Sequence, residues 1–361
     1  MKKRMLALLL AALLVLSLGA CAKKTETPAA DPETTQEPAA PAEPEAPAEA
    51  ETPAEPEAET PEEAPETDSY YPVTVEVLDP NGEAVPFTFE KAPERTLVYG
   101  RNNVEIMLAL GLGDNILMIA DCGSVLPEYQ EAFEKIDQVK NHQDVGYFVR
   151  EFALSQEPDM VIGWRSLFAM EERMGDIQFW HDRGIGTYTT INSVLRGNES
   201  LENEYADIRN IGKIYNKVDE AEEIIAKIQE KVDMGKAAAE GQEPQRILIA
   251  EKWEGEYDIY HAGTAAGDIA AQLGAEVLGE KGWTDEQIVA ANPEAIFAVH
   301  VSSVTPEEAV ALYTENPALA SVDAVKNGRI YPVVYSLAYA PGVRTSDTVS
   351  LFLNSLYGIE A

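Results

Sequence analysis

Several aromatic and arginine side chains follow the carboxyl ends of the strands that the sequence predicts. In open α/β sheets, ligands bind beyond the carboxyl ends of the strands, so these side chains are candidates for a binding site. Aromatic rings supply large apolar contact, and arginines bind carboxylates or other oxygen anions through paired hydrogen bonds. We therefore predict that a ligand-binding cleft is lined, in the first half of the chain, by Tyr99, Arg101, Trp164 and Arg165 and, in the second half, by Trp253, Tyr257, Tyr260, His261, Trp283, Tyr339 and Arg344.

Some of these positions also have a purely structural interpretation. Tyr257 and Tyr260 could be strand residues that face the sheet, and Trp283 could cover a helix end. His300, near the end of the predicted strand 296–301, is typical of a histidine that is buried in a sheet with its hydrogen bonds satisfied. Both interpretations stay open at each of these positions.

The four histidines of the chain lack the spacing of a metal site. They are His142, His181, His261 and His300, and no pair has a spacing such as His-x3-His. Because a transition metal needs three or four converging ligands, we expect no bare-metal site and no resident cofactor. A single axial ligand to a haem iron, with His261 as the best placed, stays open.

Motifs for catalysis are also missing from the sequence. It contains no Gly-x-Ser-x-Gly, no phosphate loop, no His-Glu-x-x-His and no Cys-x-x-Cys. An enzyme is therefore the minor hypothesis.

Short apolar strands that alternate with helices predict two α/β halves. The ordered region opens with a predicted β-hairpin, residues 73–78 and 85–89. The later strands are predicted at residues 96–99, 116–120, 160–164 and 187–190, and at residues 246–251, 276–278, 296–301 and 330–334. This alternation implies βαβ units and a largely parallel sheet in each half. A weak internal repeat between residues 151–162 and 286–297 supports the division, with chance similarity of two such units as the alternative.

One long helix, residues 219–240, is predicted to join the halves. Its apolar residues recur at three- and four-residue intervals, at Ala221, Ile224, Ile225, Ile228 and Val232. Asp219 suits the N-cap, Glu222 can complete a capping box, and Gly241 supplies a stop. At about 30 Å the helix could connect two lobes, although one more packing helix within a continuous domain is the alternative. The predicted domains are 69–198 for the N-terminal lobe, 199–241 for a helical segment and 242–361 for the C-terminal lobe.

The first 68 residues predict an exported and tethered protein. Residues 1–20 have the form of a signal peptide, with a basic start and an apolar run that is too short to span a bilayer comfortably. They lead to Leu18-Gly19-Ala20-Cys21, which resembles the lipobox of bacterial lipoproteins, so Cys21 is the predicted lipidation site. An ordinary signal peptide with an incidental cysteine is the alternative. Residues 21–68 repeat Pro, Ala, Glu and Thr and predict an extended tether at the extracytoplasmic face of the cell membrane.

Charge and cysteine content narrow the possible partners. The chain has 63 acidic and 27 basic residues and a net charge of -36. Nucleic acid is therefore not an expected partner, because phosphate binding needs a basic surface.

After lipidation of Cys21 only Cys122 remains, so no intrachain disulfide is expected and Cys122 is predicted to be a small buried residue.

In order and spacing, several segments resemble the lipoprotein substrate-binding components of ABC importers for ferric siderophores, haem and cobalamin. The resemblance covers residues 72–358 and rests on the opening hairpin leading to Pro93-Glu94-Arg95 and on segments 105–113, 158–162, 316–319 and 324–331. It implies two α/β lobes joined by one long helix, a ligand cleft between them, limited closure, and delivery to an ABC permease and its ATPase. We expect the receptor to be a monomer.

The resemblance also implies a docking surface, because family members present an acidic residue on each lobe to the permease. Glu172 and Glu307 match this pattern through the internal repeat. The alternative is that these acids only complement a helix N-terminus.

The resemblance leaves the ligand open. Arg101 and Arg344 suit the anionic donors of a ferric siderophore, whereas residues 159–165, with Trp164, look like the corresponding stretch of cobalamin-binding members. Ferric complexes are the commoner cargo of the family, so a siderophore-type iron(III) chelate is the leading hypothesis and cobalamin or haem the alternative. An exported enzyme or a non-transport surface lipoprotein is a minor alternative.

Overall fold

The structure is a computed structural model that describes residues 70–361, apart from residues 137–146, 254 and 281. The predicted signal peptide (1–20), the lipidation site Cys21, the tether (21–68) and His142 lie outside the described residues. Among the residues that are described, no helix is both long and apolar enough to cross a membrane.

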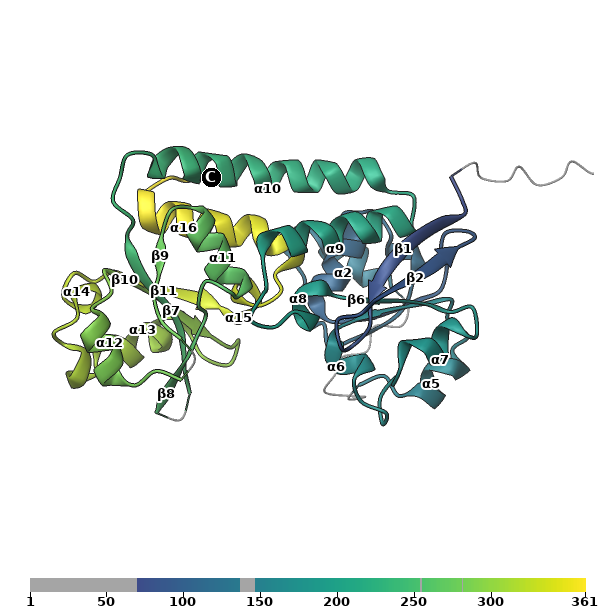
Figure 1. Cartoon of the computed structure of the whole chain (residues 1–361), viewed down its shortest axis with the longest axis horizontal. Coiled ribbons are helices and arrows are strands. Elements are labelled where there is room, and N and C mark those ends of the chain that lie inside the picture. Colours follow the sequence, from purple (N-terminus) through teal and green to yellow (C-terminus); the bar gives the residue numbers. More distant parts are fainter. Residues whose placement is uncertain (1–69, 137–146, 254, 281) are drawn as a thin grey trace, which may run out of the picture. The chain divides into compact units, whose positions relative to one another are not determined.

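The N-terminal lobe contains a four-stranded parallel sheet in the order β4-β3-β5-β6. It also contains a β-hairpin formed by β1 and β2 (Figure 1). Its strands are β1 (Val73–Leu78) and β2 (Ala84–Phe89) in the hairpin, and β3 (Thr96–Tyr99), β4 (Ile116–Ala120), β5 (Met160–Gly163) and β6 (Gly186–Thr189) in the sheet. Its helices are α2 (Arg101–Ala109), η1 (Gly113–Asn115), η2 (Pro127–Tyr129), α3 (Gln130–Glu134), α5 (Arg150–Ser155), α6 (Arg165–Phe168), α7 (Ile177–His181) and α8 (Ile191–Val194). Strands β3, β5 and β6 are buried along their whole length, as expected of a parallel sheet covered on both faces.

The C-terminal lobe contains a five-stranded sheet in the order β11-β10-β7-β8, with β9 beside β7. All of its pairs are parallel except β7 with β8. Its strands are β7 (Arg246–Trp253), β8 (Glu256–Ile259), β9 (Glu276–Val277), β10 (Ala295–His300) and β11 (Ile330–Val334). Its helices are α11 (Ala265–Gln272), α12 (Asp285–Ala291), α13 (Pro306–Thr314), η3 (Pro317–Leu319), α14 (Asp323–Lys326), α15 (Tyr335–Ala338), η4 (Gly342–Arg344) and α16 (Thr345–Tyr357).

Two helices stand between the lobes in the sequence, α9 (Leu201–Ile214) and the long α10 (Val218–Ala239), and α10 runs from one lobe to the other (Figure 1). Helix α10 packs against α9 at one end and against α16 at the other. Its buried face is made of Ala221, Ile225, Ile228 and Val232, as the apolar spacing predicted. Gly235 lets α10 approach the C-terminal end of α11 closely, because a Cβ atom at Gly235 would overlap the side chain of Leu273. The predicted fold class, two α/β lobes with largely parallel sheets and one long connecting helix, is confirmed.

The predicted start of α10 was wrong in detail. The helix begins one residue earlier than expected, after Lys217, and no side chain caps it. Asp219 therefore lies inside the first turn, where it complements the positive end of the helix dipole instead of capping it. Glu222 does not close a capping box, because its carboxylate accepts a 2.7 Å hydrogen bond from Nε of Arg209 on α9.

Every observed strand except β8 lies within two residues of its predicted bounds. Strand β8 was not predicted. It is four residues long and pairs antiparallel with β7. Such a short segment carries too little alternation to distinguish a strand from a loop.

Candidate ligand-binding cleft

Three cavities meet at a pair of stacked tyrosines between the lobes. Tyr335 and Tyr339 follow β11, and their ring centroids are 5.4 Å apart at an interplanar angle of 24°. Both line each of the three cavities, which we call the Arg101 cavity (about 410 Å³), the Glu251 cavity (about 740 Å³) and the Arg165 cavity (about 360 Å³). These volumes are in the range of small-molecule sites.

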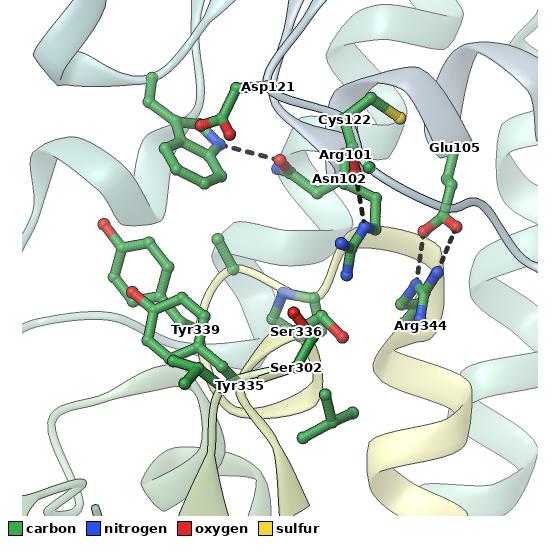
Figure 2. A pocket seen from close by; sticks show the side chains of 16 residues that line it. Arg101, Asn102, Glu105, Asp121, Cys122, Ser302, Tyr335, Ser336, Tyr339 and Arg344 are labelled. Carbon is green, nitrogen blue, oxygen red and sulfur yellow. Dashed lines mark hydrogen bonds and ion pairs between the residues drawn. The ribbon is translucent and has the colours of Figure 1, made fainter. Parts of the chain in front are cut away.

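Both lobes contribute to the Arg101 cavity (Figure 2). The N-terminal lobe supplies residues from α2 and from the ends of β4 and β5, namely Arg101, Asn102, Glu105, Asp121, Cys122, Gly123 and Trp164. The C-terminal lobe supplies residues that follow β10 and β11, namely Val301, Ser302, Val334, Tyr335, Ser336, Tyr339, Ala340, Pro341 and Arg344. The cavity therefore lies at the carboxyl ends of strands from both sheets, as the sequence rule requires.

Arg344 forms an ion pair across the two lobes (Figure 2). Its Nε and Nη2 atoms each donate a 2.7 Å hydrogen bond to the carboxylate of Glu105 on α2. The Glu105 side chain is fully buried, and one of its oxygens also accepts from the backbone N–H of Leu126 at 2.8 Å. Burial alone would lower the pKa of Arg344, but the hydrogen bonds to Glu105 outweigh it and the pKa is raised. The charge of Arg344 is thus already balanced.

Arg101 lines the same cavity but has no carboxylate partner within the described residues. Its Nε donates a 2.8 Å hydrogen bond to the carbonyl oxygen of Cys122. Gly123 has φ +67° and gives the guanidinium room, because a Cβ atom there would lie 2.8 Å from Nη2 of Arg101. Arg101 is therefore a half-buried cation that is available to an anionic ligand.

Trp164 is held at the cavity wall by polar and aromatic contacts. Its Nε1 donates a 2.8 Å hydrogen bond to Oδ1 of Asn102, and its ring is nearly perpendicular to the rings of Tyr99 and Tyr339. Nδ2 of Asn102 and Oγ of Ser336 are buried and have no hydrogen-bond partner in the described part of the chain. Unsatisfied polar atoms of this kind are rare in folded proteins and mark a place where a ligand can supply the missing bond.

The Glu251 cavity has a different lining. Its aromatic residues include Trp253, which is 63% exposed, and Tyr260. Four carboxylates line it together with Arg196 and His261; they belong to Glu199, Glu251, Glu256 and Asp258. Burial raises the pKa of the Glu199 and Glu251 carboxyls from their ordinary value.

Ten of the eleven predicted ligand-binding residues line one of the three cavities. The Arg101 cavity contains Arg101, Trp164, Tyr339 and Arg344; the Glu251 cavity contains Trp253, Tyr257, Tyr260, His261 and Tyr339; and the Arg165 cavity contains Tyr99, Trp164, Arg165 and Tyr339. Trp283 lines none of them, and its backbone pairs with that of Tyr257. Contact with a ligand stays a prediction for the whole set.

Three of these side chains are partly committed to the fold. Tyr257 is fully buried on β8, and its hydroxyl donates a 2.8 Å hydrogen bond to Asp285. Nε of Arg165 donates to the carbonyl oxygen of Pro80 at 2.6 Å. Nδ1 of His261 accepts from the backbone N–H of Gly263 at 3.0 Å, which fixes the ring but leaves Nε2 for other partners.

The remaining histidine and cysteine predictions concern buried positions. His300 is 8% exposed at the end of β10, and its Nδ1 lies 3.2 Å from the carbonyl oxygen of Val301, which fits the structural interpretation. Within the described ranges, no three His, Cys, Asp or Glu side chains converge as a metal site would require. Cys122 is 3% exposed, and burial raises the pKa of its thiol to about 12, so it is an unreactive buried residue.

Sequence reasoning missed several cavity residues. Tyr335 directly follows the predicted strand 330–334, so the rule that selected Tyr99 could also have selected it. Arg196 lies in a loop after α8 and carries no sequence signal, yet its Nη2 donates a 3.1 Å hydrogen bond to the hydroxyl of Tyr339.

Glu172 and Glu307, the predicted docking residues, are both exposed. In the described parts of the chain, neither forms an ion pair. Glu307 lies in the first turn of α13, where it complements the helix dipole as the structural alternative expects, and the capping box there is formed by Thr305 and Glu308. Docking therefore stays a prediction for both residues.

Two α/β lobes that share a cleft and are connected by a long helix define a ligand-binding receptor. Residues 97–333 match the family model described as periplasmic binding protein, and the chain belongs to this family. Members are substrate-binding transport proteins and not enzymes, so the chain is a substrate-binding protein of the ABC-transporter type.

Known relatives agree with this family. The chain is 26% identical over 305 residues to the uncharacterized ABC transporter substrate-binding lipoprotein YvrC of Bacillus subtilis (strain 168), covering 82% of this chain and 88% of the relative. It is similar in structure to a periplasmic binding protein from Veillonella parvula DSM 2008, with TM-score 0.73, 29% identity, and coverage of 79% and 92%. A protein of an ABC-type Fe3+-hydroxamate transport system from Saccharomonospora viridis DSM 43017 has TM-score 0.60 at 19% identity, with coverage of 79% and 99%, and supports the fold alone.

Proposed function

We propose that this chain is a membrane-tethered extracytoplasmic receptor that binds an iron(III) chelate of the siderophore type and delivers it to an ABC permease. The observation that carries the proposal is the Arg101 cavity, where a cation without a carboxylate partner among the described residues lines the same cavity as Trp164 and the Tyr335–Tyr339 stack. A guanidinium binds the anionic oxygen donors of a chelate, and aromatic rings contact its organic shell.

Cobalamin or haem is the second candidate. The rings of Trp164 and Tyr339, which meet at an angle of 84°, offer apolar contact to a flat macrocycle. His261 in the Glu251 cavity keeps Nε2 available as an axial ligand for haem iron.

The ligand class is tested by titrating the protein with ferrioxamine B, ferric enterobactin, haem and cyanocobalamin while tryptophan fluorescence is recorded. We expect quenching by at least one ferric chelate, with most of the change lost in Trp164→Phe. Trp180→Phe is the matched control, because Trp180 is fully buried and its Nε1 is bonded to the carbonyl of Met174. Quenching by haem or cyanocobalamin alone would select the second candidate, and no response to any of the four would contradict both.

The tether and the docking surface are tested separately. Lipidation at Cys21 predicts that Cys21→Ala moves the protein from the membrane fraction to the soluble fraction. Docking predicts that Glu172→Lys and Glu307→Lys lower ligand uptake by cells while the purified variants bind ligand normally. Glu243→Lys, an exposed acid that follows α10, is the control for a change of charge alone. Unchanged uptake in both docking variants would remove this part of the proposal.

We also propose that the receptor works as a monomer. Light scattering during size-exclusion chromatography measures its mass directly, and a dimer at micromolar concentration would contradict this point.

A further inference from the structure

The acidic wall of the Glu251 cavity contains like charges placed opposite one another. In the antiparallel pair β7–β8, Glu251 is directly opposite Asp258, and Glu256 is opposite Trp253. Like charges at directly opposed positions of two strands destabilise the pair. In agreement with this geometry, burial raises the pKa of Glu251 and the neighbouring Asp258 adds to the increase, whereas the hydrogen bond from Tyr260 and the charge of His300 lower it. The folded protein thus retains a repulsion between Glu251 and Asp258 in the lining of the Glu251 cavity.

No ion pair in the described part of the chain balances this charge, although Arg196 and His261 partly offset the charge of Glu199. None of the four carboxylates that line the cavity takes part in an ion pair there. Arg196 is the arginine of the lining, but its guanidinium is directed to Tyr339, with a 3.1 Å hydrogen bond to the hydroxyl and its carbon 5.7 Å from the ring centroid. A positive group of a ligand would relieve the repulsion.

The same cavity offers aromatic surfaces to a cation. Trp253 is 63% exposed, and Tyr335 and Tyr339 stack at the border with the Arg101 cavity. Aromatic faces attract ammonium groups. The carboxylates do not converge as metal ligands within the described residues, so the arrangement fits an organic cation better than a bare metal ion.

The adjoining Arg101 cavity carries the complementary chemistry. In the Arg101 cavity, Asn102 is 4% exposed and its Nδ2 has no partner among the described residues. Oγ of Ser336 is also without a partner there, and Arg101 adds a positive charge. These groups donate hydrogen bonds, and they suit oxygen anions.

We propose that the ligand binds with a fixed polarity, with its anionic oxygen donors in the Arg101 cavity and an organic ammonium group in the Glu251 cavity. This inference rests on the proposed function and narrows the ligand to chelates that carry an amine. The Tyr335–Tyr339 stack contacts both parts because it borders both cavities.

A matched pair of ferric chelates tests this polarity. Ferrioxamine B has a free terminal ammonium group, and its N-acetyl derivative has the same iron centre without that charge. Calorimetric titration should show on the order of tenfold tighter binding of the amine form, as expected for a charged hydrogen bond. The preference should disappear in Glu251→Gln and persist in Glu243→Gln, which removes an exposed acid outside the cavity. Equal binding of the two chelates by the unchanged protein would overturn the inference while leaving the proposed function intact.

A second arm does not depend on the iron centre. Spermidine alone at millimolar concentration should raise the Tm of the unchanged protein more than that of Glu251→Gln. If neither ferric chelate binds but spermidine shows this difference, the ammonium site stands and the iron proposal fails. If spermidine raises the Tm of both proteins equally, or of neither, the ammonium site is overturned.

Discussion

The two ends of the cleft differ in how their charges are balanced. At the Arg101 end, Arg344 and Glu105 neutralise one another across the lobes, and the Glu105 side chain is fully buried. At the Glu251 end, acids line an open cavity and face one another across β7 and β8. The comparison teaches that a charged residue in a cleft is not by itself a ligand contact. Paired charges connect the lobes, and unpaired charges remain for a ligand.

The largest expected effect follows from breaking the pair that connects the lobes. Arg344→Gln leaves the carboxylate of Glu105 buried without its cation, so the free energy of unfolding should fall by about 3–5 kcal/mol. Urea denaturation measures this loss. Arg101→Gln is the matched control and should change stability by no more than about 0.5 kcal/mol, because it removes only a hydrogen bond to a carbonyl. The double change Glu105→Gln with Arg344→Gln should recover part of the lost unfolding free energy. Equal losses of unfolding free energy in Arg344→Gln and Arg101→Gln would contradict the distinction between a paired and an unpaired arginine.

A second contact between the lobes predicts a dependence on pH. Glu204 on α9 is fully buried and accepts hydrogen bonds from Asn192 and from the backbone N–H of Gly342. Burial raises its pKa from 4.5 to about 7, with the nearby Glu199 carboxylate adding to the increase. The folded protein therefore holds a proton that the unfolded chain releases between about pH 4.5 and 7. This contribution to stability is complete below the lower pH and is lost as the pH rises through the upper one.

We expect the unfolding free energy to fall by on the order of 1–3 kcal/mol across that window because of Glu204. Glu204→Gln should remove this slope, and Glu243→Gln should keep it. The other carboxylate close to Glu204 is Asp207, whose pKa burial raises well above its ordinary value, so the comparison must be made between variants and not from the unchanged protein alone. A slope that is the same in Glu204→Gln would show that this contact does not titrate in the range.

The smallest expected effect concerns the unpaired arginine. Arg101→Gln should weaken binding of the anionic ferric enterobactin about tenfold without a matching loss of stability. The difference in affinity between the unchanged protein and Arg101→Gln should narrow at high salt, because Arg101 is only half-buried and its charge is partly screened. Arg183→Gln is the control, since Arg183 is an exposed arginine of the N-terminal lobe outside the cavities. An unchanged affinity in Arg101→Gln would place the anionic end of the ligand elsewhere.

The fold could be predicted from sequence because its signals are local. The bounds of β3, β4 and β11 were predicted to the residue, since each is a short apolar run followed by a helix or turn signal. The face of α10 followed from helical spacing. Strand β8 was missed because its four residues depend on pairing with β7, which is a tertiary contact.

The site was only partly predictable, because pairing of charges is set by distant residues. Sequence position placed Arg344 in the cleft, but Glu105 lies 239 residues away, and nothing local showed that the two neutralise one another. The same limit applies to Arg196, which reaches Tyr339 across 143 residues. Position along a strand indicates which residues reach the cleft, and the structure is needed to show which of them are free to bind.

The most direct test of the receptor proposal is the position of iron in the complex. Crystals grown with ferrioxamine B or ferric enterobactin can be measured at the iron absorption edge, where anomalous scattering locates the metal. We expect one iron site inside the cleft, bordered by Trp164 and by Tyr335 and Tyr339. Iron bound on the outer surface, or a cleft left empty while the chelate is bound elsewhere, would contradict it.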